Sequence, residues 1–409
     1  MNLILTLAWR NLWRNKRRSM ISLAAIAFAL LMQAAQVGLQ QGTYTENIEV
    51  AIRLSSLHMQ VQAPDYADKP TLRNSFSYNA AVRGPLDSSE LVTAYTPRIY
   101  SDGLISVGEK SMGVMIIALD PAAEQGISDF HKKVNAGAFL QSADAFDIVV
   151  GYKLLENLGA AIGDSVVVLS QGFDGYLGNF FFRIVGTIKT GSPESDRFGI
   201  FMPLGTAQEL MGMWGRASVV AIALPSLDDI PAAQAELQPH YAAQNLAVRP
   251  WNEVLSSLKQ MIEFDRISGD IQMLLLTMVI AIGILNTLIM SVTERFREFG
   301  IMLSLGMRNG ALARMVMWEV LMLALLGVLA GNALALGVNA WLTFSPIELG
   351  GDLVEIYEEW GFLPIMRSSL APMIFIRSSL TIFGFTLLAA LYPVWKTFRL
   401  EPLRGIRYT

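Results

Sequence analysis

Four long apolar segments dominate the pattern of hydrophobic and polar residues along the chain. They lie within residues 19–41, 251–293, 313–342 and 373–396. Each reaches the roughly 20 consecutive apolar residues that a helix needs to cross about 30 Å of hydrocarbon. The pattern therefore predicts four membrane-spanning helices, the second of which occupies only part of its segment.

Basic residues gather at one end of every span. They precede the first span, separate the second from the third and follow the fourth, as Arg10, Arg14, Lys16, Arg17, Arg295, Arg297, Arg308, Arg314, Lys396 and Arg399. Because Lys and Arg near span ends are retained on the cytoplasmic side, both termini and the segment 294–312 are predicted to be cytoplasmic. The region 42–250 and the loop 343–372 are then on the other side, and residues 397–409 form a cytoplasmic tail.

The first 18 residues have an amphipathic pattern. Trp9 and Trp13 share a helical face with leucines, while Arg10 and Arg14 lie on another face. This arrangement is typical of a helix at the membrane interface, so residues 1–18 are predicted to form an interfacial helix. A cleaved signal peptide is the alternative for the start of the chain. We disfavour it because the apolar run is longer than the core of a signal peptide and the other three spans require a first partner.

The region 42–250 alternates short β-branched strands with helical patterns. Strands are predicted near residues 57–62, 165–169, 181–188 and 218–224, and helices near 152–158 and 206–211. This mixture predicts an α+β domain. Residues 251–293 contain no proline, so one helix of about 65 Å is expected there, with its outer part forming a stalk above the second span.

Composition and motifs exclude several classes of function. The chain is 53% hydrophobic and 16% charged with a mean hydropathy of +0.41, against about 25% charged residues in soluble domains. The net charge of −4 argues against nucleic-acid binding, and the absence of cysteine excludes disulfides and thiolate sites. His58, His131 and His240 lack metal-ligand spacing, and neither a P-loop nor a G-x-S-x-G motif occurs. We expect no enzyme site, cofactor or metal in this chain.

The segment from Asn286 to Gly306, NTLIMSVTERFREFGIMLSLG, carries the most information. An apolar helix changes there into a short charged segment and then into a second apolar run, through Glu294, Arg295, Arg297, Glu298, Gly300, Leu305 and Gly306. This pattern predicts a short amphipathic helix on the cytoplasmic surface that offers charges to a soluble partner. An ordinary cytoplasmic loop is the alternative explanation for the charges alone.

The whole string resembles the cytoplasmic turn after the second membrane helix of the MacB/FtsX/LolC-LolE permeases, the type VII ABC transporter fold. Further likeness lies in Gly151, Leu154, Leu158, Gly159, Gly163, Asp164 and Val166, in Pro203, Leu204, Ala207, Gln208 and Leu210, and in the C-terminal Pro393, Pro402, Leu403 and Arg404. The segment around residue 151 favours the LolC/LolE lipoprotein-releasing branch. The resemblance implies that Glu294 to Gly306 is a coupling element seated on a separate ATPase.

The resemblance also implies an assembly and a cargo. It implies a permease in the bacterial inner membrane that pairs with itself or a related subunit. Two ATPase chains, which bind ATP and Mg, drive it by mechanotransmission. The expected cargo is a lipoprotein passed to a periplasmic carrier. A MacB-like exporter that works with an adaptor, and an FtsX-like module that activates a periplasmic hydrolase, remain alternatives.

Two further sets of residues are candidates for binding. Gln33 and Gln36, with Met32 and Val37, are expected to line a cargo cavity, because amides facing lipid are costly. The glycine-rich loop 171–180 carries apolar side chains that are candidates for a partner surface, unless they pack on their own domain: Phe173, Tyr176, Leu177 and Phe180.

Two features of the third span concern packing. Gly327 and Gly331 lie four residues apart, which allows close helix packing within the subunit or, alternatively, at a dimer seam. Glu319, near the inner end of the same span, is expected to pair with a nearby arginine such as Arg314.

Overall fold

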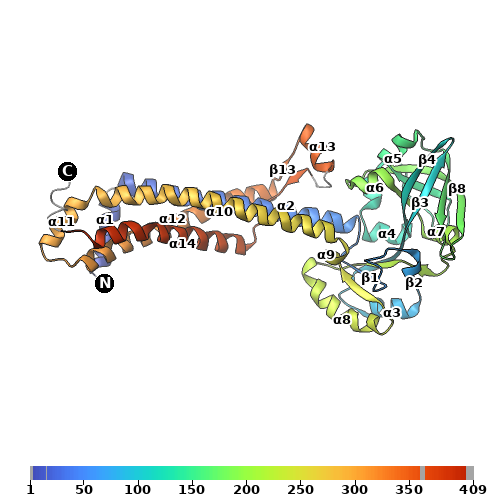
Figure 1. The fold of residues 1–409 in the computed structure, drawn as a ribbon, viewed down its shortest axis with the longest axis horizontal. Coiled ribbons are helices and arrows are strands. Elements are labelled where there is room, and N and C mark those ends of the chain that lie inside the picture. The colour runs from blue at the N-terminus through green and yellow to red at the C-terminus, as the bar shows by residue number, and fades with distance from the viewer. Residues whose placement is uncertain (1–2, 15, 360–363, 402–409) are drawn as a thin grey trace. The chain divides into compact units, whose positions relative to one another are not determined.

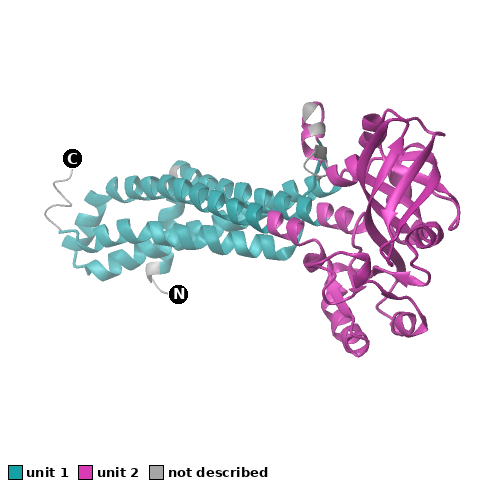
Figure 2. Cartoon of the chain, turned by 45° about the vertical axis from the view of Figure 1, so that its right-hand side comes forward, with its two compact units in different colours: residues 1–45, 263–348, 365–409 teal, residues 46–262, 349–364 magenta. Residues whose placement is uncertain are grey.

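The structure is a computed structural model that describes residues 3–14, 16–359 and 364–401. The chain divides into two compact units (Figure 2). Unit 1 comprises Met1–Thr45, Glu263–Glu348 and Ile365–Thr409, and unit 2 comprises Glu46–Ile262 and Leu349–Pro364. The predicted motif residues Pro402, Leu403 and Arg404 lie outside the described residues.

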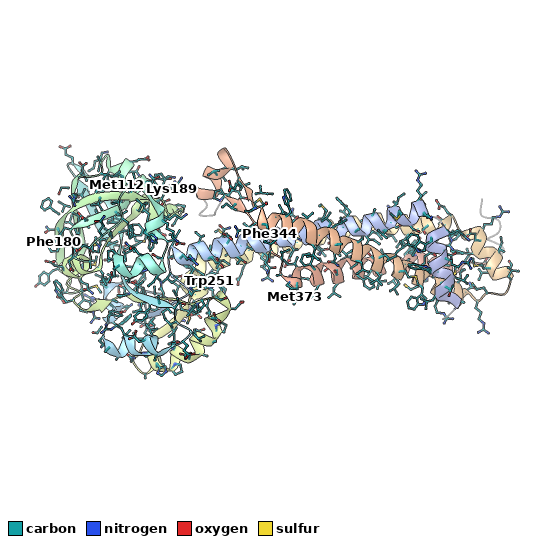
Figure 3. The ribbon with its side chains drawn as sticks, turned by 180° about the vertical axis from the view of Figure 1, so that it is seen from behind. Met112, Phe180, Lys189, Trp251, Phe344 and Met373 are labelled. Carbon is teal, nitrogen blue, oxygen red and sulfur yellow. The ribbon has the colours of Figure 1, made fainter. Side chains whose placement is uncertain are left out.

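Unit 1 is built from long helices that lie side by side (Figure 1). Its elements are α1 (Leu3–Arg14), α2 (Lys16–Arg53), α10 (Ser256–Thr293), α11 (Phe296–Ser304), α12 (Asn309–Phe344), β13 (Ile347–Glu348), β14 (Ile365–Met366) and α14 (Pro372–Phe398). Helices α2 and α10 each continue into unit 2 along the chain. Phe344 and Met373, near the end of α12 and the start of α14, lie at the same end of the bundle (Figure 3).

Four helices of the described chain are long and apolar enough to cross a membrane: Ser19–Arg53, Ser256–Thr293, Asn309–Phe344 and Pro372–Phe398. Their inner faces pack in one cluster that includes Leu30, Ile284 and Val320. Large apolar side chains remain on the outside of the bundle; Leu380, for example, is 68% exposed. An apolar outer surface is stable only when lipid covers it, so the bundle is a membrane domain.

The predicted stalk helix is interrupted once. Helix α9 (Trp251–Val254) ends at Leu255, whose φ of −97° and ψ of 53° are not helical, and α10 begins at Ser256. The prediction of one helix over residues 251–293 is therefore wrong at that residue. Helix α10 alone has 38 residues and is about 57 Å long.

Unit 2 is an α+β domain inserted between the first and second spans, as predicted. Its strands are β1 (Met59–Gln62), β2 (Phe76–Ser77), β3 (Ala94–Val107), β4 (Lys110–Leu119), β5 (Val134–Gly137), β6 (Asp147–Gly151), β7 (Ser165–Gln171), β8 (Leu177–Ile188), β9 (Gly199–Pro203), β10 (Arg216–Ala217), β11 (Val219–Ala223) and β12 (Ala247–Pro250). Its helices are α3 (Ala80–Ser88), α4 (Pro121–Ile127), α5 (Tyr152–Leu158), α6 (Pro193–Phe198), α7 (Leu204–Met211) and α8 (Ile230–Ala242), with short 3₁₀ turns between. Unit 2 also includes α13 (Asp352–Glu359), which belongs to the segment between the third and fourth spans.

The main sheet has two parts that share the long strand β3. Strand β3 pairs with β4, followed by β9, β6 and β8, and β7 joins β8 back to β3. Six strands thus close into a ring around a core that includes Ile116, Phe182 and Ile200. The first residues of β3 pair with β11 instead, which continues to β1 and β12. That second part packs its apolar side, including Val61 and Ile222, with Leu237 of α8 in a separate core.

Candidate functional site

Helix α11 is amphipathic, and its apolar side belongs to the bundle. Phe296, Phe299 and Leu303 recur at helical spacing and are buried, together with Val292 at the end of α10 and Leu312 of α12. Burial of this apolar stripe holds α11 against the bundle. The opposite side, through Arg297, Ile301, Ser304 and Leu305, is exposed, and Leu305 is 83% exposed.

Arg295, immediately before α11, points inward rather than toward solvent. Its guanidinium donates to both carboxylate oxygens of Glu319 in α12, at 3.0 and 2.7 Å. Both side chains are only 11% exposed, and the guanidinium lies 5.0 Å from the centre of the Phe299 ring. The two buried charges attract each other strongly, and removal of either one would leave the other charge buried without its partner. The prediction that Glu319 pairs with an arginine is confirmed, but the arginine is Arg295 and not Arg314.

Glu298 extends this network to the N-terminal helix. Its carboxylate accepts a hydrogen bond from Arg295 at 3.3 Å and others from Arg14, at the end of α1. Burial alone would raise the pKa of Glu298, but the hydrogen bonds from Arg14 and Arg295 outweigh it and hold the pKa below its ordinary value. The charges Arg14, Glu298, Arg295 and Glu319 therefore connect α1, α11 and α12.

The structure divides the predicted coupling residues into two groups. Glu294, Arg297 and Leu305 are exposed, whereas Arg295 and Gly300 are buried and Glu298 is partly covered. Gly306 has a φ of +95°, a conformation that favours glycine, and it lies in the turn between α11 and α12. Sequence reasoning missed Ile301 on the exposed side and Arg14 in the network. The i, i+4 spacing of Arg297, Ile301 and Leu305 is the signal that could have found Ile301.

The proposed cavity residues of the first span occupy different environments. Gln33 is buried at 8% exposure, while Gln36 and Met32 are exposed and Val37 packs partly against the bundle core. The Gln33 Oε1 atom makes no hydrogen bond with any described residue. The structure therefore does not gather these four side chains around one space.

A group of hydrogen bonds that the sequence analysis missed joins α2 to α12 and to the segment before α14. The buried Asn339 of α12 donates to the carbonyl of Ala34 at 3.3 Å and accepts from the hydroxyl of Ser368 at 2.6 Å. Gly38 contacts Asn339 and Ser368 so closely that a Cβ atom would collide with both. Gly38 thus allows the segment before α14 to contact both α2 and α12 at the end of the bundle near Phe344.

Gly327 and Gly331 pack against the first span within the same chain. A Cβ on Gly327 would lie 2.7 Å from Ile26, and one on Gly331 would lie 2.9 Å from the carbonyl oxygen of Ala27. Both distances are shorter than a Cβ tolerates, so these glycines allow the close contact between α12 and α2.

Residues 172–176 form the turn of the β7–β8 hairpin, so the predicted loop 171–180 is too long and includes the start of β8. Its four candidate side chains lie in two environments. Phe173 and Phe180 pack against the ring core, and Phe180 is labelled at the edge of the domain in Figure 3. Tyr176 and Leu177 are 81% and 74% exposed. Phe181, which was not predicted, is 72% exposed and lies four residues after Leu177, on the same side of β8. The exposed apolar group is therefore Tyr176, Leu177 and Phe181.

Among the residues that the structure describes, no three His, Cys, Asp or Glu side chains lie close enough together to hold a metal ion.

Comparison with known proteins agrees with this architecture. Residues 19–240 match the family described as MacB-like periplasmic core domain, and residues 271–402 match FtsX-like permease C-terminal. The transmembrane protein LolC of the lipoprotein-releasing system of Neisseria meningitidis is 23% identical over 95% of this chain and 94% of its own length. LolE of Haemophilus influenzae is 21% identical over 98% of both chains.

A third relative combines the permease with a further region. The pyoverdine export ATP-binding/permease protein PvdT of Pseudomonas syringae is 25% identical over 83% of this chain, which spans 52% of that protein. The two matched families cover the four spans and most of the inserted domain. The chain therefore belongs to the family of FtsX-like membrane permeases that carry a MacB-like periplasmic core domain.

Proposed function

We propose that this chain is the membrane subunit of an ATP-driven transporter and that a separate ATPase docks on the exposed side of α11. The observation that carries the proposal is the division of α11 into two sides. Its inner side is fixed by burial and by the Arg295–Glu319 pair, while Arg297, Ile301 and Leu305 stay outside. An exposed apolar pair flanked by charge at the end of a membrane helix is typical of a protein contact rather than of a solvated loop.

Under this proposal the membrane is the bacterial inner membrane, with both termini cytoplasmic and unit 2 periplasmic. The basic residues at the inner ends of the spans support this orientation. Two ATPase chains, which supply ATP and Mg, serve a dimer of permease subunits. Closure of the ATPases pushes α11, and α10 carries the displacement along the chain into unit 2. Such a cycle performs work only if the ATP-bound and free states hold cargo differently.

The proposed cargo is a lipoprotein of the inner membrane, handed to a periplasmic carrier. The similarity to LolC and LolE over nearly the whole chain supports this cargo. Tyr176, Leu177 and Phe181 at the hairpin tip are the proposed contact for the carrier, because an exposed apolar group on a hydrophilic domain is typical of a partner site.

The docking proposal is tested by replacing apolar side chains on the exposed side of α11. Ile301→Asp and Leu305→Asp are expected to abolish co-purification of the ATPase from native membranes, because each places an unpaired charge in an apolar contact. Leu353→Asp in α13 is the matched control, since Leu353 is also exposed and apolar but lies in unit 2. Retention of the ATPase by both α11 variants, at wild-type yield, would exclude this docking surface.

The cargo proposal needs a separate measurement. Intact-mass spectrometry of the complex purified from native membranes is expected to detect a lipid-modified protein bound to it. An adaptor or a hydrolase in its place, with no lipoprotein, would favour export or signalling. The hairpin is tested by Leu177→Ser with Phe181→Ser, which should reduce transfer to the carrier but leave ATPase binding unchanged.

A further inference from the structure

One end of the main sheet of unit 2 has a polar face that is buried. In strands β1 and β12 the residues Met59, Val61 and Val248 pack in the apolar core with α8. Because successive side chains alternate across a strand, Gln60, Gln62 and Arg249 project from the opposite face. Gln60 and Gln62 are only 3% and 2% exposed. Amides buried to this degree require hydrogen-bond partners.

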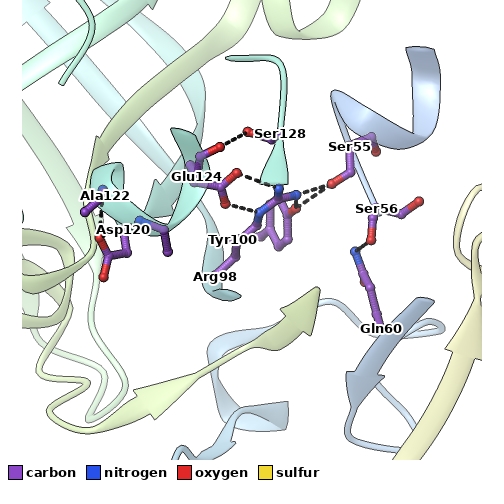
Figure 4. A network of polar contacts seen from close by, with 10 residues as sticks. Ser55, Ser56, Gln60, Arg98, Tyr100, Asp120, Ala122, Glu124 and Ser128 are labelled. Carbon is purple, nitrogen blue, oxygen red and sulfur yellow. Dashed lines mark hydrogen bonds and ion pairs between the residues drawn. The ribbon is translucent and has the colours of Figure 1, made fainter. Parts of the chain in front are cut away.

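Part of this polar region is fully paired (Figure 4). Arg98 of β3 is completely buried and donates to both carboxylate oxygens of Glu124, at 2.7 and 2.9 Å, and to the carbonyl of Ser55. The Gln60 amide donates to the carbonyl of Ser56 at 3.2 Å. The guanidinium of Arg98 and the amide nitrogen of Gln60 thus have hydrogen-bond partners within the chain and do not call for a ligand.

The neighbouring polar groups are not paired. The Nε2 atom of Gln62, the hydroxyl of Tyr66 and the Nε atom of Arg249 are buried and make no hydrogen bond with any described residue. Gln62 and Tyr66 are 2% and 6% exposed as whole residues. An unpaired buried donor costs stability, so three of them together in a native domain call for an explanation.

The three residues that carry these atoms line one cavity, which has a volume of about 710 Å³. This size lies in the range of small-molecule sites. Tyr100 and Gln60 form further wall, and Asp68 and Glu253 lie at the exposed rim. The cavity wall thus includes three side chains that carry unpaired donors, and carboxylates lie at its rim.

The charges of the cavity disfavour an anion. Arg249 already donates to Glu253 at 2.7 Å, and Asp68 adds a further negative charge. Burial raises the pKa of Tyr66, against a smaller opposite effect of the nearby Ser218 hydroxyl, so the phenol keeps its proton and remains a donor. The interior therefore offers donors to neutral oxygen atoms, while the rim accepts hydrogen bonds from the same ligand.

We propose that this cavity binds a small neutral carbohydrate, a mono- or disaccharide. Each sugar hydroxyl donates one hydrogen bond and accepts two, so it can pair with Gln62 and Arg249 inside and with Asp68 or Glu253 at the rim. The Tyr100 ring supplies an aromatic wall against which the C–H face of a sugar can pack. The assignment is independent of the proposed ATPase docking.

A peptide fits the same cavity less well. Protein domains usually bind peptides along a sheet edge or in an apolar groove, where backbone pairing or side-chain pockets give affinity. This cavity lies over the face of a sheet, where Gln60, Gln62 and Arg249 of the paired strands β1 and β12 line it.

The test uses the full-length chain in lipid nanodiscs or in a detergent without a sugar headgroup, because a maltoside would compete. Glucose, galactose, N-acetylglucosamine, maltose and trehalose are titrated by calorimetry and by saturation-transfer NMR. We expect saturable binding of at least one of them with a dissociation constant below about 1 mM. Absence of binding by all five at about tenfold higher concentration overturns the proposal.

Two variants test whether the sugar binds in the cavity. Gln62→Met and Tyr66→Phe are expected to weaken binding about fivefold or more, because each removes one hydrogen bond to the sugar. Gln171→Met, at an exposed glutamine of β7, is the matched control and should bind as the wild type does.

A stability readout separates binding from folding. Without sugar, Tyr66→Phe should melt no lower than the wild type, since its hydroxyl has no partner to lose. Equal sugar binding by Gln62→Met, Tyr66→Phe and the wild type would refute the site. Binding of neutral tri-alanine with no sugar binding would refute the carbohydrate class.

Discussion

Removal of one partner from the Arg295–Glu319 pair should destabilise the membrane domain severely. Glu319→Ala leaves the Arg295 guanidinium, which is 11% exposed, with Glu298 at 3.3 Å as its remaining carboxylate. One nitrogen of that guanidinium, Nη2, is already buried without a hydrogen-bond partner among the described residues. Breaking a buried pair by removing one partner costs about 3–5 kcal/mol, and we expect Glu319→Ala to fall in that range.

Removal of both charges should cost much less. Arg295→Met combined with Glu319→Leu replaces the pair with apolar side chains of similar length, in contact with Phe299 and the surrounding cluster. Apolar replacement of a whole buried pair is often neutral, because neither charge remains desolvated. The double variant is therefore expected to recover most of the stability that either single variant, Arg295→Met or Glu319→Leu, loses, and a double-mutant cycle built from these three variants should report a coupling of at least about 3 kcal/mol.

The assay is unfolding of the purified chain by SDS titration in mixed micelles, followed by tryptophan fluorescence. Arg14→Ala is the control, because Arg14 and Glu298 are 56% and 42% exposed and such pairs contribute about 1 kcal/mol or less. If Glu319→Ala costs no more than Arg14→Ala, the pair does not hold α11 to α12. If the double variant loses the sum of the single losses, the effect is packing rather than charge.

Three further outcomes are expected. Gly331→Leu should destabilise the bundle by about 1–3 kcal/mol, because its side chain must displace Ala27; an unchanged melting temperature would contradict that contact. Asn339→Leu should cost about 1–3 kcal/mol by leaving the Ser368 hydroxyl and the Ala34 carbonyl without their buried partner, and the same melting assay, with exposed Asn179→Leu as control, measures it. The pKa of Glu298 is lower in the folded chain than its ordinary value of 4.5, so the ionised carboxylate stabilises the fold above pH 4.5, and this contribution is lost as the pH falls through the folded pKa. Arg14→Gln should therefore reduce the difference in melting temperature between pH 7 and pH 3.5. An unchanged difference would refute this role of Arg14.

The periodic parts of the fold could be predicted because burial repeats along the chain. Apolar runs predicted the four spans, and alternation predicted strands such as β7 and β8 within a few residues. The pairings between strands could not be predicted in this way. Strand β3 contacts β4, β7 and β11, and the choice of partners depends on the packing of the whole domain rather than on local pattern.

The partner of Glu319 shows why side-chain contacts were harder to predict. Arg314 is close in sequence, but five residues along a helix turn the side chain by about 140°, so Arg314 and Glu319 lie on different faces. Arg314 instead donates to the carbonyl of Gly310. Arg295 is 24 residues away and reaches Glu319 because α12, after α11 and the turn that follows it, packs alongside the end of α10. Sequence separation therefore gave the wrong arginine.

The charge pattern of α11 separates two roles that the sequence could not distinguish. Arg295 and Arg297 are two residues apart, so they project from nearly opposite sides of the chain. The first is held by Glu319, and the second is exposed. Reversal of charge at Arg295 would disrupt the bundle before it tested any partner, whereas Arg297→Glu changes only the exposed side. Since α11 is joined to α10 by the chain, to α12 through Arg295 and to α1 through Glu298, a force applied at Arg297 or Leu305 cannot displace α11 alone. Any displacement must be shared with those three helices, and a docked ATPase would therefore act on the bundle as a whole.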